Sequence, residues 1–166
     1  VVHTIRHIGT QAFYNNNITS TSTITIPASV TTIGSTVFYY ISTITSVTFA
    51  AGSVLESIGT DAFRGTSINS IIIPASVTSI GNNAFMGINQ LTSVTFIEST
   101  NWTNGITIGS QVFHSTPALA NVFIKDGQVI KDSSLNPITT TLGTTGSFFG
   151  SPSSTVISSY EIEGSG

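Results

Sequence analysis

A hexapeptide of the form Ile-Gly-x-x-Ala/Val-Phe occurs five times in this 166-residue chain. Its copies begin at Ile8, Ile33, Ile58, Ile80 and Ile108, so successive copies are 25, 25, 22 and 28 residues apart. A self-similar period in this range is typical of a solenoid, in which each repeat forms one coil and stacks on the next. Five coils are enough to build a continuous core, so we expect one domain.

A second pattern in each repeat predicts a β-strand. Leu91, Val94 and Phe96 are apolar at positions i, i+3 and i+5, with hydroxyl side chains between them. The same spacing recurs at Ile44-Val47-Phe49, Ile68-Ile71-Ile73 and Leu119-Val122-Ile124, and more weakly at Ile24-Ile26. The end of each pattern alternates as a strand does. Because so short a strand buries little alone, we expect it to pair in parallel with its equivalent in the next coil.

The hexapeptide predicts the opposite side of each coil. Its glycine is followed by Ser, Thr or Asn, which favour helix N-caps, so a single helical or 3-10 turn is expected there. The glycine itself indicates either a positive φ or a close approach to the next coil, and the sequence leaves both open. The phenylalanines should stack as an internal column, made of Phe13, Phe38, Phe63, Phe85 and Phe113.

The repeat text resembles that of a known family. Residues 73–85 read Ile-Pro-Ala-Ser-Val-Thr-Ser-Ile-Gly-Asn-Asn-Ala-Phe, and residues 91–96 read Leu-Thr-Ser-Val-Thr-Phe, which resembles the BspA-like leucine-rich repeat. The resemblance covers about residues 5–124. It implies a non-enzymatic solenoid, mostly secreted or displayed at the cell surface, that binds other proteins or mediates adhesion. The cysteine that this family commonly carries after Ala-Phe is absent, because the chain has no cysteine.

The predicted fold is therefore mainly β, a leucine-rich-repeat solenoid of about five coils with parallel strands and a C-terminal β cap. We place the solenoid at residues 1–124, a hairpin or cap segment at 125–163 and a flexible tail at 164–166. Asp126-Gly127 predicts a hairpin turn between 122–124 and 129–130. Residues 155–163 are expected to add a last strand. The first coil enters in mid-repeat, so we expect it to be incomplete.

Low charge limits the partners that this chain is expected to bind. Charged residues make up 7% of the sequence, against a usual level of about 25%. The net charge is −3 and there is no basic stripe, so nucleic acid is not an expected partner. No apolar run approaches the roughly 18 residues of a membrane span. A nearly uncharged surface lacks the repulsion that keeps copies apart, so self-association is plausible.

The sequence contains no recognisable catalytic, cofactor-binding or metal site, so we expect no enzyme activity and no cofactor. The only histidines are His3, His7 and His114, and the first two have metal spacing only on a helix, whereas this stretch looks extended. The glycine-rich segment 143–150 lacks the Gly-Lys-Ser/Thr of a phosphate loop. Asn17 and Asn101 begin glycosylation sequons, whose modification the sequence leaves open.

The outward side chains of the predicted strands form the candidate partner-binding surface. One row comprises Thr23, Ser46, Ser70, Ser93 and Asn121, and the other comprises Thr25, Thr48, Ile72, Thr95 and Phe123. Leucine-rich repeats usually bind on such a face, although a merely solvated face explains these residue types equally well. Trp102, in a loop expected at 101–105, is an additional candidate contact residue.

Two functional hypotheses follow. The first is a secreted or cell-surface protein that binds a protein or surface ligand and acts in adhesion. The second is a structural subunit that assembles with copies of itself, end to end, into an extracellular filament or surface lattice. Ice binding by the threonine rows is a weaker alternative, since Ile72 and Phe123 interrupt them.

Overall fold

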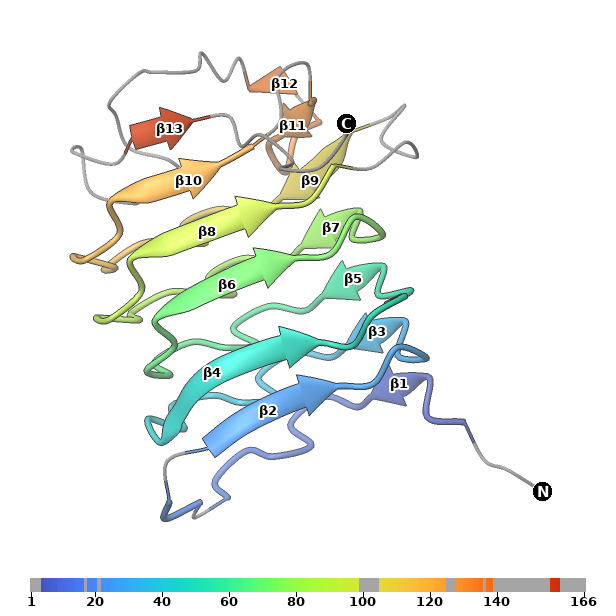
Figure 1. The fold of residues 1–166 in the computed structure, drawn as a ribbon, viewed down its shortest axis with the longest axis vertical. Coiled ribbons are helices and arrows are strands. Elements are labelled where there is room, and N and C mark those ends of the chain that lie inside the picture. The colour runs from blue at the N-terminus through green and yellow to red at the C-terminus, as the bar shows by residue number, and fades with distance from the viewer. Residues whose placement is uncertain are drawn as a thin grey trace, which may run out of the picture.

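Each sequence repeat forms one coil, which contains a long strand, a short strand and a segment of turns. The computed structural model describes residues 4–16, 18–20, 22–98, 105–124, 128–135, 137–138 and 156–158. The coils stack so that equivalent elements lie above one another (Figure 1). The described residues contain strands and turns but no helix. The predicted parallel solenoid is thereby confirmed.

The strands form two walls of the solenoid. The long-strand wall comprises β2 (Ser22–Ile26), β4 (Ile44–Phe49), β6 (Ser70–Ile73), β8 (Ser93–Phe96), β10 (Asn121–Phe123) and β13 (Val156–Ser158). The short-strand wall comprises β1 (His7–Ile8), β3 (Thr32–Ile33), β5 (Ser57–Ile58), β7 (Ser79–Ile80), β9 (Ile106–Ile108), β11 (Ile130–Lys131) and β12 (Pro137–Ile138). The short strands form one sheet in the order β1-β3-β5-β7-β9-β11-β12, whereas the long strands divide into a β2-β4 pair and a β6-β8-β10-β13 sheet. Pairing is parallel throughout the described strands except between β11 and β12.

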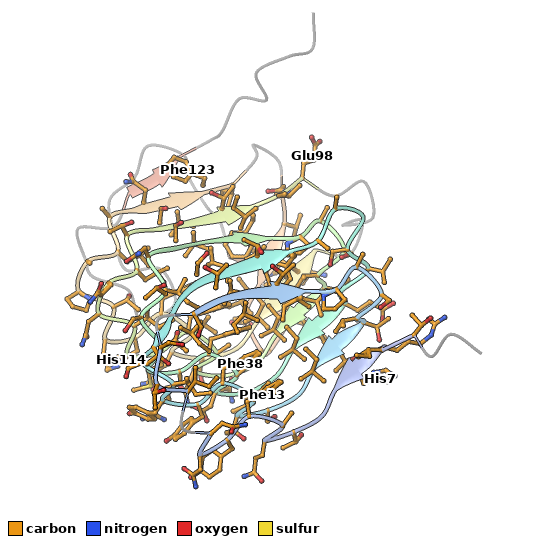
Figure 2. The ribbon with its side chains drawn as sticks, turned by 60° about the horizontal axis from the view of Figure 1, so that its bottom comes forward. His7, Phe13, Phe38, Glu98, His114 and Phe123 are labelled. Atoms are coloured by element: carbon orange, nitrogen blue, oxygen red, sulfur yellow. The ribbon has the colours of Figure 1, made fainter. Side chains whose placement is uncertain are left out.

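The core between the walls contains the predicted column of aromatic rings. Phe38, Phe63, Phe85 and Phe113 are buried, and Phe13 caps the column at the first coil, where its side chain is 38% exposed. Neighbouring ring centroids lie 5.2 to 5.8 Å apart with interplanar angles of 1° to 18°. Figure 2 shows Phe13 and Phe38 on the side of the coil opposite the long strands. The internal column is confirmed, with its first ring partly open.

The predicted helical turns are wrong. The second residue after each hexapeptide glycine has a left-handed φ of 53° to 60°, which a right-handed helix cannot accommodate. These residues are Gln11, Thr36, Asp61, Asn83 and Gln111. In the first four of these turns, the N–H of the left-handed residue donates to a carbonyl of the next coil, as from Thr36 to the Thr60 carbonyl (2.9 Å). Bonding between coils thus replaces the local bonding of a helix, and we call this third side of the solenoid the turn stack.

Close approach of the backbone explains the hexapeptide glycines. A Cβ built on Gly59 would lie 2.5 Å from the carbonyl carbon of Gly34, and one on Gly81 would lie 2.5 Å from the amide nitrogen of Thr60. Neither glycine has a positive φ. Of the two explanations that the sequence left open, crowding between coils is therefore the correct one.

The described residues after 124, which are 128–135, 137–138 and 156–158, add strands to both walls of the solenoid. The hairpin predicted between 122–124 and 129–130 does not form, because β10 and β11 lie in different sheets and β11 pairs in parallel with β9. The predicted turn itself, 125–127, lies outside the described residues. Ile130 is fully buried in the common core. The predicted last strand is confirmed as β13, which pairs in parallel with β10.

Candidate binding surfaces

The structure aligns the two predicted rows within each part of the long-strand wall. Every residue of the rows is exposed or half-buried. In the β2-β4 pair, Thr23 lies beside Ser46 and Thr25 beside Thr48, whose hydroxyl oxygens are 3.1 Å apart. In the other sheet, the register aligns Ser70, Ser93 and Asn121 in one row, and Ile72, Thr95 and Phe123 in the other. Trp102 lies outside the described residues.

The long-strand wall is interrupted between β4 and β6, and a proline lies at the interruption. In neighbouring coils the residue after the strand donates its N–H to the last strand residue of the preceding coil. Ala50 donates to Ile26 and Ile97 donates to Ile73, each at 3.0 Å. Pro74 occupies the same position after β6 but has no N–H, so it cannot make this bond to the end of β4.

The interruption is local. The chain entering β6 still bonds to the start of β4, through Ser67 N–H to the Ile44 carbonyl (2.9 Å) and Asn69 N–H to the Thr45 carbonyl (3.3 Å). The ladder therefore stops part of the way along the two strands, toward the end where Pro74 lies.

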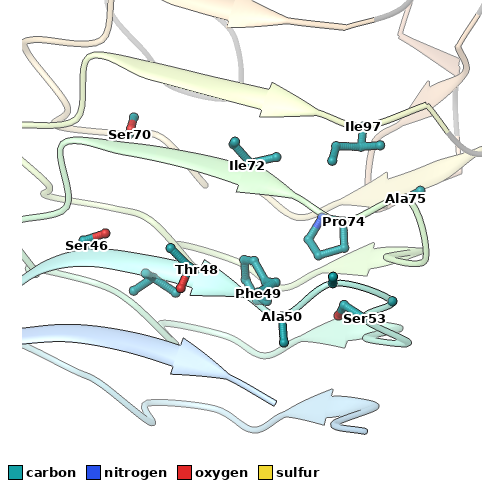
Figure 3. Close-up of a pocket in the computed structure, with 13 residues that line it drawn as sticks. Ser46, Thr48, Phe49, Ala50, Ser53, Ser70, Ile72, Pro74, Ala75 and Ile97 are labelled. Carbon is teal, nitrogen blue, oxygen red and sulfur yellow. The ribbon is translucent and has the colours of Figure 1, made fainter. Parts of the chain in front are cut away.

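A groove of about 560 Å³ lies on the outward face at this interruption (Figure 3). It is lined by Ser46, Val47, Thr48, Phe49, Ala50, Ala51, Gly52, Ser53, Ser70, Ile72, Pro74, Ala75 and Ile97. Ile72 and Ile97 are 56% and 41% exposed. None of the lining residues is ionisable. The groove therefore suits an apolar, uncharged group, whose burial away from water is favourable in free energy. Four residues of the predicted rows line the groove: Ser46, Thr48, Ser70 and Ile72.

A second cluster lies on the turn stack, and the sequence analysis missed it. The residue after each column phenylalanine points away from the core in successive coils: Tyr14, Tyr39, Arg64, Met86 and His114. The rings of Tyr14 and Tyr39 are 5.7 Å apart, and Tyr39 meets Tyr40 edge to face at 4.6 Å. The Arg64 guanidinium carbon lies 5.7 Å from both the Tyr39 and the Tyr40 ring centroid. We call Tyr14, Tyr39, Tyr40 and Arg64 the tyrosine cluster.

Asp61 balances the charge of this cluster. Its Oδ1 accepts a hydrogen bond from Arg64 Nη1 at 3.2 Å, three residues apart on the same turn. Desolvation acts to lower the pKa of Arg64, but the bonds to Asp61 and Tyr40 outweigh it and the pKa is raised. The guanidinium therefore stays charged, and the cluster presents aromatic surface and hydrogen-bond donors with no net charge.

Aligning the repeats would have revealed the cluster. The position after the column phenylalanine carries Tyr in the first two coils and Arg in the third, a run of large contact-forming side chains.

The two described histidines, His7 and His114, do not belong to a metal-binding cluster. Among the described residues, no three His, Cys, Asp or Glu side chains gather in a way that would hold a metal ion. His7 is exposed on β1, and His114 is exposed with its Nδ1 2.9 Å from the hydroxyl of Ser115. His3 lies outside the described residues. No described helix is long and apolar enough to cross a membrane.

Comparison with known proteins assigns the repeat. Residues 5–138 match the model of the BspA-type leucine-rich repeat region in six copies, one more than the five hexapeptides. No curated protein sequence matches the chain. Among solved structures, the pneumococcal vaccine antigen PcpA is similar with 28% identity and a TM-score of 0.68, over 89% of this chain and 37% of that protein. The chain thus spans little more than a third of this relative.

Two further solved structures are more distant. A leucine-rich cell surface protein from Faecalibacterium prausnitzii is 19% identical with a TM-score of 0.34, over 95% of this chain and 67% of that one. A leucine-rich repeat protein from Bacteroides ovatus is 18% identical with a TM-score of 0.33, over 78% of this chain and 55% of that one.

Proposed function

The chain belongs to the BspA-type leucine-rich repeat family, and on that premise we propose that it is a non-enzymatic secreted or cell-surface protein that acts in adhesion by binding another protein. Leucine-rich repeats in general present an extended face to protein partners. The observation that carries the proposal is the uncharged groove on the outward long-strand face, to which both predicted rows contribute.

Ile72 is the contact residue that we propose at the centre of this groove. Its side chain is 56% exposed although it is flanked in sequence by the buried Ile71 and Ile73. Because Ile72 is 56% exposed, covering its remaining surface in an interface is worth roughly half of the 1.5–3 kcal/mol for a fully exposed side chain. The hydroxyl groups of Ser46, Thr48 and Ser70 around it supply hydrogen-bond donors and acceptors that set the orientation of a partner.

The test compares two arginine substitutions at matched exposed isoleucines. Ile72→Arg places a charge in the groove, and Ile5→Arg places one on the first coil, where Ile5 is 60% exposed. The wild-type chain and both variants are screened against immobilised, purified extracellular proteins. We expect at least one protein to be retained by the wild type and by Ile5→Arg but not by Ile72→Arg. Retention that Ile72→Arg leaves unchanged would exclude the groove, and no retention by a monomeric wild type would exclude the function.

The second candidate function is a structural subunit that assembles end to end into a filament or lattice. It is supported by the low charge of the chain, in which 7% of the residues are Asp, Glu, Lys or Arg, so little repulsion keeps copies apart. A cavity of about 380 Å³ at the first coil is lined mainly by apolar residues that include Ile8, Phe13 and Ile24. Apolar surfaces of this kind are places where copies of a chain can associate.

The same variants distinguish the two candidates. If the chain assembles through its first coil, light scattering and electron microscopy will show polymers for the wild type and Ile72→Arg, and smaller particles for Ile5→Arg. A wild-type chain that stays monomeric at high concentration contradicts assembly. The binding test and the assembly test are independent, because the groove and the first-coil cavity have no lining residue in common.

A further inference from the structure

We propose that the tyrosine cluster is a second binding surface, which takes an extended proline-rich segment of a partner protein lying along the axis of the solenoid. The cluster lies on the turn stack and shares no residue with the groove of the long-strand wall. The inference is therefore separate from the function assigned to that groove.

The first argument is the concentration of contact-forming side chains. The chain has four tyrosines and two arginines in all, and three of the tyrosines and one arginine meet in this cluster. Tyrosine and arginine are the residue types that, with tryptophan, most often dominate binding energy at protein interfaces. Each tyrosine combines an apolar ring with a hydroxyl at its tip, so it can pack and hydrogen-bond in one contact.

The second argument is the backbone of Tyr40. Its φ is 54°, in the left-handed region that a bulky side chain rarely adopts. The equivalent positions of the other coils carry Asn15, Gly65, Gly87 and Ser115. The Tyr40 side chain is 59% exposed, so burial in the core does not offset the strain. Strain that stability does not require is typical of residues held for binding.

The Tyr40 ring packs against Gly65 of the next coil, where a φ of 68° itself favours glycine. A Cβ on Gly65 would lie 2.6 Å from Tyr40 Cδ1, so any other residue there would displace the ring. Tyr40 also meets Tyr39 edge to face. The ring is therefore held in a fixed place on the surface, and a rigid aromatic contact loses little entropy on binding.

The third argument is the spacing along the solenoid. Paired strands, and hence successive coils, lie about 4.7–4.9 Å apart, so the coils of Tyr14 and Arg64 are separated by about 9.5 Å. A polyproline II helix rises about 3.1 Å per residue with three residues per turn, so its face repeats at about 9.3 Å. A proline-rich segment aligned with the axis would place every third residue against an equivalent position two coils further on.

The chemistry of the cluster fits such a segment. Polyproline II has no internal hydrogen bonds, so its carbonyls are free to accept from tyrosine hydroxyls and from the guanidinium of Arg64. Aromatic surfaces bind proline rings in several peptide-recognition domains. Because Asp61 already pairs with Arg64, the cluster together with Asp61 has no net charge and requires no charged ligand.

The experiment titrates the 166-residue chain with an N- and C-blocked decaproline peptide, followed by amide shifts in NMR and by calorimetry. A blocked Gly-Ser decapeptide is the control ligand. We expect saturable binding of decaproline, with the largest amide shifts at the cluster, and no binding of the Gly-Ser peptide. Tyr40→Asn removes the ring but keeps a residue type that the first coil carries at this position, and it should weaken binding about tenfold or more.

Two variants outside the cluster test whether decaproline binds at the cluster alone. His114→Ala changes an exposed residue of the same outward row away from the cluster, and Ile72→Arg changes the groove; both should bind decaproline as the wild type does. Absence of decaproline binding by the wild type overturns the proposal, as does binding that survives Tyr40→Asn in a folded variant. A panel of neutral oligosaccharides is tested in parallel, and cluster-dependent binding of a sugar in place of decaproline would equally overturn it.

Discussion

The turn stack and the long-strand wall enclose the same core, but only the wall is interrupted. Between the second and third coils the turn stack keeps its bonds, from Thr36 to Thr60 and from Phe38 to Ala62, at 2.9 and 2.8 Å. Across the same two coils β4 and β6 fall into different sheets. A solenoid bonded continuously on its other sides can therefore tolerate a gap in one wall, and that gap is where the groove lies.

The two regions also differ in what their outward side chains offer. The wall presents small hydroxyl residues around an apolar groove, whereas the turn stack presents large side chains that pack on one another. The inner rows of both regions are mostly apolar and buried, with Thr66 and Thr116 as buried polar members of the turn stack. The repeat thus fixes the interior and leaves each outward position free to vary from coil to coil.

The largest expected effect is a loss of stability when a ring is removed from the phenylalanine column. Phe63→Ala removes a fully buried ring stacked between two others, and should lower the free energy of unfolding by about 3–5 kcal/mol. Urea unfolding followed by circular dichroism measures it. Phe13→Ala is the control, because Phe13 is 38% exposed and stacks on one side only. An equal loss at both positions would contradict a closed column with one open end.

The next largest effect is the loss of stability expected when a crowded glycine of the hexapeptide is replaced by alanine. Gly59→Ala would push a Cβ against the backbone of Gly34, and overpacking of this kind costs about 1–3 kcal/mol. The matched control is Gly9→Ala, since a Cβ on Gly9 meets nothing within 4 Å. Thermal unfolding should show a lower midpoint for Gly59→Ala and little change for Gly9→Ala. If both variants melted as the wild type does, crowding between coils would not explain these glycines.

The Pro74→Ala substitution, which should change stability less, tests whether Pro74 causes the interruption of the long-strand wall. Pro74→Ala restores an N–H at the position from which Ala50 and Ile97 donate in their coils. The new hydrogen bond is worth about 0.5–1.5 kcal/mol, which is offset by about 0.4–1 kcal/mol of unfolded-state entropy, so stability should change by about 1 kcal/mol or less. The decisive measurement is hydrogen exchange of the new amide, which should be protected.

The control for this prediction is Pro27→Ala. Pro27 follows β2, which lies at the end of its sheet, so a restored amide there has no described strand to donate to and should exchange quickly. Fast exchange at residue 74 as well would show that something other than the missing N–H separates β4 from β6.

The smallest expected change in the free energy of unfolding is for a substitution that relieves the backbone strain of Tyr40. Tyr40→Asn relieves a left-handed backbone that costs a bulky residue about 1–2 kcal/mol, but it loses the edge-to-face contact with Tyr39, worth about 0.5–1.5 kcal/mol. The two terms nearly cancel, so the free energy of unfolding should stay within about 1 kcal/mol of the wild type. Tyr39→Ala, which loses the contact without relieving the strain, should be the less stable of the two by urea unfolding.

Residues that obey the period of the repeat were predictable from the sequence. The column phenylalanines, the strand apolar residues and the outward rows all follow from spacing, because each coil must bury the same positions against its neighbours. The glycines were recognised as special, but choosing between positive φ and close approach required coordinates. The helical turn was wrong because side-chain preference for an N-cap is weak beside backbone bonds between coils.

The candidate surfaces show the same division. Ile72 and Thr48 were predicted to face outward, yet the groove beside them lies where β4 and β6 fall into different sheets and where the preceding coil turns after β4. Pro74 directly follows β6, and no local pattern in the sequence indicates that its missing N–H also leaves the end of β4 without the bond made in neighbouring coils. The hairpin at 122–130 was wrong for a related reason, since Asp126-Gly127 is a local signal and pairing of β11 with β9 is a long-range choice.

The repeat period specifies a stack of parallel coils with aromatic rings inside, because each coil must bury the same side chains against its neighbours. The contacts between coils set which glycines are crowded, where the strand wall opens and which outward residues meet as the tyrosine cluster. Most of those features arise between residues about one repeat apart, where contacts depend on how one coil packs on the next rather than on local preference.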